Sequence, residues 1–202
     1  MTDQDITALV SSRICHDLIS PIGAISNGVE LLSVSGSGSS PELGLIGDSV
    51  TSATDRLRCF RIAFGAADPG AELPAAEVKA AVEALFQGRS SVQAAVGGQP
   101  VPRMIGKALL LALLCQERCL PMGGATTVTI TQDGFDIRTQ TTRVKDVEQL
   151  WTMIDRPSSR VEIAPAEVQF LLLGQMLQQT GGTLRHETTD DTILITAKGL
   201  TN

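Results

Sequence analysis

The segment RICHDLISPIG, residues 13–23, sets a histidine beside an acid and places a proline five residues after the histidine. From Ile14 to Leu32, apolar residues recur at steps of three or four, which is the spacing of one stripe along an α-helix. The sequence therefore predicts a helix over residues 3–32. A proline inside that helix is unexpected, because it removes a backbone donor and costs about 3 kcal/mol.

His16 is predicted to face away from the apolar stripe. Each helical residue advances by about 100°, which places His16 roughly 160° from Leu18 at the centre of the stripe. Pro21 crowds the carbonyl of Asp17 and is expected to bend the helix one turn beyond His16. The same arithmetic puts polar or small residues around the imidazole, which leaves it open to another macromolecule. These neighbours are Ser12, Arg13, Asp17, Ser20, Gly23 and Asn27.

A second helix is predicted over residues 41–64, after the Gly/Ser-rich turn SVSGSGSSPE at 33–42. Its apolar residues alternate steps of three and four from Leu43 to Phe64 without a slip, as in a coiled-coil seam. Two helices with one stripe each cannot enclose a core alone. We therefore expect the helical hairpin to pair with a second copy in a homodimeric four-helix bundle.

The second half of the chain has a different sequence pattern, and the segment GAADPGAELP at 65–74 marks the boundary. We predict a hairpin domain at 1–66 and a second domain at 74–202. Mixed helices and antiparallel strands indicate an α+β fold with a two-layer sandwich. Helices are predicted at 75–86, 102–119, 144–154 and 165–179, and strands at 91–96, 183–187 and 192–197, with a β-hairpin at 126–140 around Asp133-Gly134.

Composition narrows the possible functions. The net charge is −6 and Lys/Arg residues do not cluster, which argues against a nucleic-acid surface. The first ten residues lack the basic segment of a signal peptide, and the apolar run at 108–115 is too short to cross a bilayer. We expect a cytoplasmic protein, with no membrane partner, whose four cysteines are buried apolar thiols without a metal.

The run His16-Asp17-Leu18-x-x-Pro21-Ile22 resembles the phosphoacceptor motif of sensor histidine kinases, H-[DE]-L-x-x-P-[LI]. In that family the motif lies on the first helix of a dimeric hairpin, which matches the setting predicted above. The resemblance implies that His16 accepts a phosphoryl group on Nε2 and that Asp17 orients the imidazole through Nδ1. It also implies an ATP-binding α/β sandwich after the hairpin.

That second domain lacks the residues with which kinases grip a nucleotide. Residues 108–131 resemble the kinase stretch N-L-x-x-N-A-x-x-Y-T-P-x-G-G in shape, but Leu111 and Cys115 occupy the two Asn positions. No D-x-G-x-G follows the β-hairpin, and residues 160–170 contain no glycine where kinases carry a G-x-G-L-G loop. We therefore expect no ATP to bind.

The whole pattern resembles the ChpT-type histidine phosphotransferases, which are dimeric and carry a degenerate, nucleotide-free second domain. This resemblance implies that His16 takes a phosphoryl group from the receiver-domain aspartate of a hybrid kinase and passes it to response regulators. The receiver would supply Mg²⁺, and this chain would bind no cofactor or metal. The expected docking residues are Arg13, Ser12, Ser20, Pro21, Gly23, Asn27 and Arg56.

Two alternatives stay open at this point. An active histidine kinase would bind ATP, which the absent asparagines and glycines argue against. A non-catalytic dimeric adaptor of the same fold would carry His16 without using it, although such a protein has no need to keep the proline. Label from a phosphorylated receiver, label from ATP, or no label at all would separate these readings.

Overall fold

The computed structural model describes residues 5–35, 40–68, 70–86, 90–157 and 163–200. Its elements are α1 (Ile6–Ser35), α2 (Ser40–Ala63), β1 (Glu72–Leu73), α3 (Ala75–Leu85), β2 (Ser91–Ala95), β3 (Val101–Pro102), α4 (Arg103–Glu117), β4 (Ala125–Ile130), β5 (Phe135–Gln140), α5 (Glu148–Asp155), the short 3₁₀ helix η1 (Pro165–Glu167), α6 (Val168–Thr180), β6 (Thr183–Thr188) and β7 (Thr192–Lys198). The predicted α+β fold, a helical hairpin followed by an α/β sandwich, is confirmed.

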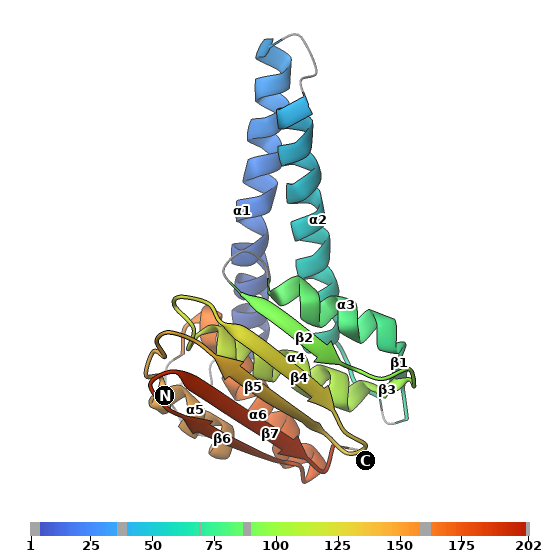
Figure 1. Ribbon diagram of the computed structural model, residues 1–202, viewed down its shortest axis with the longest axis vertical. Coiled ribbons are helices and arrows are strands. Elements are labelled where there is room, and N and C mark those ends of the chain that lie inside the picture. Colours follow the sequence, from blue (N-terminus) through green and yellow to red (C-terminus); the bar gives the residue numbers. More distant parts are fainter. Residues whose placement is uncertain (1–4, 36–39, 69, 87–89, 158–162, 201–202) are drawn as a thin grey trace.

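Helices α1 and α2 form the predicted hairpin, which projects from the rest of the molecule (Figure 1). The side chain of Asp5 caps α1 by accepting a hydrogen bond from the backbone N–H of Ala8 at 3.2 Å. The two helices approach closely at Gly28, where a Cβ would lie 2.6 Å from Cγ1 of Ile46. Helix α1 continues through Pro21. The turn was predicted at 33–42, but α1 extends to Ser35 and α2 begins at Ser40, and residues 36–39 lie outside the described residues.

The second half of the chain folds into a five-stranded sheet with strand order β2-β4-β5-β7-β6, covered on one face by helices (Figure 1). Only the β2–β4 pair is parallel among these strands. Buried residues alternate with exposed ones along β4 and β5 and with partly buried ones along β7, which is the pattern of a sheet with one face against a core and the other toward water. The two-layer sandwich follows from this alternation.

Helix α4 forms the centre of the helical layer, since nearly its whole length from Ile105 to Gln116 is buried. Two glycines permit close approaches elsewhere in this domain. A Cβ at Gly134 would lie 1.9 Å from the carbonyl oxygen of Ala197, so only glycine lets the β4–β5 turn reach the end of β7. At Gly174 a Cβ would lie 2.7 Å from the carbonyl oxygen of Ile154, where α6 crosses α5.

The structure differs from the local predictions in three places. The helix predicted at 144–154 begins only at Glu148, and the preceding segment is held by backbone hydrogen bonds from the N–H groups of Val144 and Lys145 to the carbonyls of Asp190 and Cys119. The last helix is split into η1 and α6. The two-residue strands β1 and β3, which pair with each other, were not predicted.

No helix among the described residues is long and apolar enough to span a membrane. The division into 1–66 and 74–202 stays a prediction.

Candidate functional site: the phosphoacceptor face of α1

His16 lies on the exposed face of α1 with its imidazole open to solvent, as the helical spacing predicted. Its side chain is 83% exposed, whereas that of the neighbouring Asp17 is only 13% exposed. Nδ1 of His16 lies 3.1 Å from Oδ1 of Asp17. A carboxylate can only accept, so Nδ1 carries the proton in a neutral ring and Nε2 presents its lone pair to solvent.

Arg13 does not lie where the sequence placed it. The expectation that it faces outward and offers its guanidinium to a docking partner is wrong, because its side chain is only 6% exposed. Its Nε donates to Oδ2 of Asp17 at 2.9 Å, and its Nη1 donates to the carbonyl oxygen of Ala166 at 2.8 Å. Helical-wheel arithmetic treats α1 alone and cannot register that η1 covers this side of the helix.

Arg13 also belongs to a charged network that joins the hairpin to the second domain. Its Nη2 lies 3.5 Å from Oε2 of Glu117 at the end of α4, and the other oxygen of Glu117 accepts a hydrogen bond from Nη2 of Arg56 at 3.1 Å. Burial by itself would lower the pKa of Arg56, but the charges of Glu117 and Asp17 outweigh that effect and raise it. Arg56 is thus held by Glu117, with a quarter of its side chain exposed.

Sequence reasoning missed Glu117 and Ala166 as neighbours of this site. A signal for Glu117 existed in principle, since it is the acid that ends a long apolar helix. Ala166 contributes only a backbone carbonyl, which no sequence pattern marks. The remaining docking candidates are placed by α1 around His16: Ser12, Ser20, Gly23 and Asn27 are exposed, and Pro21 is partly exposed.

The two positions that correspond to the kinase asparagines are not accessible to a ligand. Leu111 and Cys115 are both fully buried within α4, where neither side chain can coordinate a cation or reach a phosphate. Helix α6 packs on α4 through a hydrogen bond from Nε2 of Gln169 to the carbonyl oxygen of Leu114 at 3.2 Å. These residues do not fit Mg²⁺ and a triphosphate.

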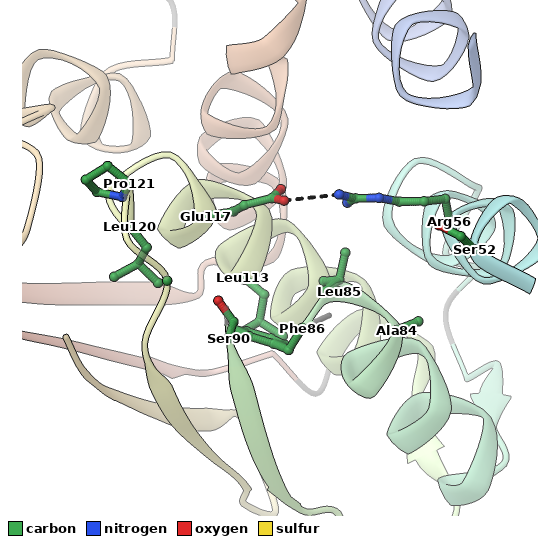
Figure 2. Close-up of a pocket in the computed structure, with 11 residues that line it drawn as sticks. Ser52, Arg56, Ala84, Leu85, Phe86, Ser90, Leu113, Glu117, Leu120 and Pro121 are labelled. Carbon is green, nitrogen blue, oxygen red and sulfur yellow. Dashed lines mark hydrogen bonds and ion pairs between the residues drawn. The ribbon is translucent and has the colours of Figure 1, made fainter. Parts of the chain in front are cut away.

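A cavity of about 440 Å³ lies between α2, α3 and α4, beside the Arg56–Glu117 ion pair (Figure 2). Ser52 and Arg56 line it from the hairpin, and Leu85, Phe86 and Leu113 contribute apolar side chains from the second domain. The cavity therefore lies at the junction of the hairpin and the sandwich.

The cysteines only partly match the expectation of buried thiols. Cys59, Cys115 and Cys119 are buried, but Cys15 is exposed on α1 beside His16, which corrects the expectation for that residue. Burial raises the pKa of Cys59 to about 12 and that of Cys119 to about 11. These two thiols are therefore protonated at neutral pH.

Comparison with known proteins identifies the family. Residues 75–192, more than half of the chain, match the family model described as the histidine phosphotransferase C-terminal domain. The chain belongs to the histidine phosphotransferase family. The predicted ChpT-type resemblance is confirmed by a second finding, 36% identity over 136 residues to the protein phosphotransferase ChpT of Brucella abortus (strain 2308). That match covers 66% of this chain and 65% of the relative, slightly less than two thirds of its length.

A solved structure supports the same assignment for this histidine phosphotransferase. The chain is similar to a bacterial phosphotransferase determined at 1.7 Å, with a TM-score of 0.80 and 27% sequence identity. The match covers 98% of both chains, so the hairpin and the sandwich are both included. The likeness therefore extends over the α1 segment that carries His16.

Proposed function

We propose that this histidine phosphotransferase relays phosphoryl groups between receiver domains, with His16 as the covalent carrier. The observation that supports this most is the arrangement of its imidazole: Nδ1 is held by Asp17 at 3.1 Å, and the ring is otherwise exposed. A large globular partner can reach such a ring, whereas a buried histidine would react only with small molecules.

The reaction needs few groups from this chain. The Nε2 lone pair of His16 attacks the phosphorus of a receiver aspartyl phosphate, the N–P bond forms, and the P–O bond to the aspartate breaks, which releases the carboxylate. Phosphorylation makes the ring cationic, and the carboxylate of Asp17 beside Nδ1 stabilises that charge. The reverse attack by an aspartate of a second receiver passes the group onward. The receiver supplies Mg²⁺.

The docking face in this proposal is the exposed side of α1 around His16. Ser12, Ser20, Gly23 and Asn27 present small or polar surfaces there, and Pro21 lies among them. Arg13 is excluded from this face by its burial. Arg56 could meet an acidic partner only with the part of its side chain that Glu117 leaves exposed.

The active form in this proposal is a homodimer. Along α2, Ile46, Ala53 and Phe60 are partly or fully buried, whereas Leu43, Val50 and Leu57 are about half exposed at a seven-residue spacing. On α1, Ile19, Ile22 and Val29 are exposed as well. Two apolar rows on neighbouring helices are what a second hairpin would cover in a four-helix bundle.

The proposal includes no ATP-dependent kinase activity and no bound cofactor, and it places the protein in the cytoplasm. The burial of Leu111 and Cys115 supports the absence of nucleotide binding.

The test uses the full chain, isolated receiver domains charged with [³²P]acetyl phosphate, and [γ-³²P]ATP in a separate reaction. We expect label from at least one receiver, none from ATP, and none in either reaction with His16→Gln. Label from ATP would identify a kinase instead. Absence of label from every hybrid-kinase and response-regulator receiver of the source organism would leave a non-catalytic adaptor. Asp190→Asn, an exposed change far along the chain, is the matched control.

A further inference from the structure

We propose that Arg13 is a positioning residue for phosphoryl transfer and that the second domain holds it in place. This inference rests on the proposed function, because it concerns how His16 is presented for reaction. The feature that prompts it is an arginine with a 6% exposed side chain on the helix face that otherwise carries exposed residues such as Ser12, Cys15 and His16.

Arg13 determines how Asp17 faces the imidazole. The two carboxylate oxygens have separate partners: Oδ2 accepts from Nε of Arg13 at 2.9 Å, and Oδ1 lies 3.1 Å from Nδ1 of His16. Without Arg13 the carboxylate could rotate about its last bond or leave the imidazole, because adjacent residues on a helix do not face each other. The ring would then lose the acceptor that fixes its tautomer.

The orientation of Arg13 is set from outside α1. Its Nη1 donates to the carbonyl oxygen of Ala166 in η1 at 2.8 Å, and its Nη2 lies 3.5 Å from Glu117 on α4. The guanidinium is planar and rigid, so contacts at its two terminal nitrogens fix the direction in which Nε donates. The second domain thereby controls the acid beside His16.

The charges of the network link Asp17 to the second domain. Two cations, Arg13 and Arg56, alternate with two anions, Asp17 and Glu117, over contacts of 2.9 to 3.5 Å. Arg13 and Asp17 are the most buried members, with side chains 6% and 13% exposed, so loss of a neighbouring charge leaves the Arg13 guanidinium less compensated and free to shift. A change at Glu117 in the second domain is therefore expected to reach His16 on the hairpin.

This gives the second domain a role that requires no nucleotide. It completes the phosphoacceptor site by holding Arg13 against Asp17, although it contributes no atom to the reaction.

The experiment measures the intrinsic reactivity of His16 with potassium phosphoramidate, which avoids any dependence on partner docking. Nε2 attacks phosphorus, the P–N bond of phosphoramidate breaks, and ammonia leaves. The variants are Arg13→Met, Arg13→Lys and Glu117→Gln. The control is Arg185→Met, which removes an exposed positive charge on the edge strand β6. Long-range ¹H–¹⁵N correlation spectra report the imidazole tautomer, with only two histidines in the chain to assign.

We expect Arg13→Met to slow phosphorylation by about 10- to 100-fold and to reduce the population with the proton on Nδ1. Arg13→Lys should also be slow, because an ammonium cannot make the three contacts at once. Glu117→Gln should shift both readouts in the same direction by a smaller amount, and Arg185→Met should match the wild type. If Arg13→Met does not fold, the lysine and Glu117 variants decide the question.

Wild-type rate and tautomer in both Arg13→Lys and Glu117→Gln would overturn this inference. That outcome differs from failure of the proposed function, in which the wild-type protein itself would not accept a phosphoryl group at His16 from any receiver. A slow rate with an unchanged tautomer would also contradict the positioning role, since it would indicate a general loss of structure.

Discussion

Oδ1 of Asp17 lies 3.1 Å from Nδ1 of His16. This contact leaves Nε2 on the other side of the ring available for reaction. The opposite oxygen is bound to a donor, Nε of Arg13. This geometry makes the replacement of Asp17 by its amide informative, because an amide is an acceptor at only one of its two ends.

We predict that Asp17→Asn slows phosphorylation of His16 by about 100-fold. Arg13 requires an acceptor, so the amide oxygen will turn toward its Nε and the NH₂ group will face the imidazole. The ring must then accept at Nδ1 and carry its proton on Nε2, which removes the nucleophilic lone pair. Initial rates with phosphoramidate measure the effect, and the exposed change Glu187→Gln on β6 is the control. A loss smaller than twofold contradicts the assigned role of Asp17.

Restoring asparagine at a kinase position should not restore ATP binding. Cys115→Asn places an amide at a fully buried position of α4, where an unsatisfied polar group costs about 2 to 4 kcal/mol. We expect a lower free energy of unfolding in urea and no change in the fluorescence of Trp151 when ATP and Mg²⁺ are added. Cys115→Ser is the smaller matched change. Saturable ATP binding by the wild-type protein would contradict the conclusion that the burial of Leu111 and Cys115 prevents nucleotide binding.

The exposed seam of α2 should control association. Val50→Glu introduces a charge into the row Leu43, Val50 and Leu57 and should raise the dimer dissociation constant at least about 100-fold. Thr51→Glu makes the same charge change one residue along, at an exposed position outside that row, and should leave the dimer intact. Sedimentation velocity at micromolar concentration reports both. A Val50→Glu protein that stays dimeric would place the interface elsewhere.

Folding stability should decline in alkaline solution because of buried thiols. Burial raises the pKa of Cys119 from its ordinary value of 9.0 to about 11, so the folded state resists ionisation that the unfolded state undergoes. The thiol contributes its full stabilisation below pH 9 and loses it as the pH rises through 11. Between pH 7.5 and 10.5 this amounts to about 1 to 2 kcal/mol.

Urea unfolding at those two pH values, compared between the wild type and Cys119→Ala, isolates this contribution. The chain has no tyrosine, so lysines and the other thiols are the main groups that also titrate in this range. The variant should show a smaller decrease in the free energy of unfolding. An equal decrease in both proteins would mean that Cys119 ionises as readily folded as unfolded.

Periodicity and turn chemistry predicted most of the fold. The stripes on the hairpin helices and the Asp133-Gly134 turn are local signals, and the structure places the corresponding elements within a few residues. Helix α5 begins at Glu148, and the segment before it makes backbone hydrogen bonds to carbonyls distant in the sequence, which no local signal reports. Strands β1 and β3 are too short to carry an alternation.

In the candidate site, too, one feature follows from local sequence and another depends on tertiary contacts. The exposure of His16 follows from the geometry of α1 alone, and the sequence predicted it. The burial of Arg13 depends on where η1 and α4 pack against that helix, and no spacing within residues 13–23 reports it. Arg13, which the sequence predicted as a docking residue, therefore belongs to an internal network because of contacts between the hairpin and the second domain.

The most direct test of the account is to locate the phosphoryl group on the chain after reaction with a phosphorylated receiver domain. Electron-transfer fragmentation of peptides kept at neutral or alkaline pH distinguishes the two histidines. We predict phosphate on His16 and none on His186. The ring of His186 is largely buried and stacks on Trp151, with the two ring centroids 4.5 Å apart. Phosphate on His186, or on a residue other than His16, would contradict the assignment of His16 as the carrier.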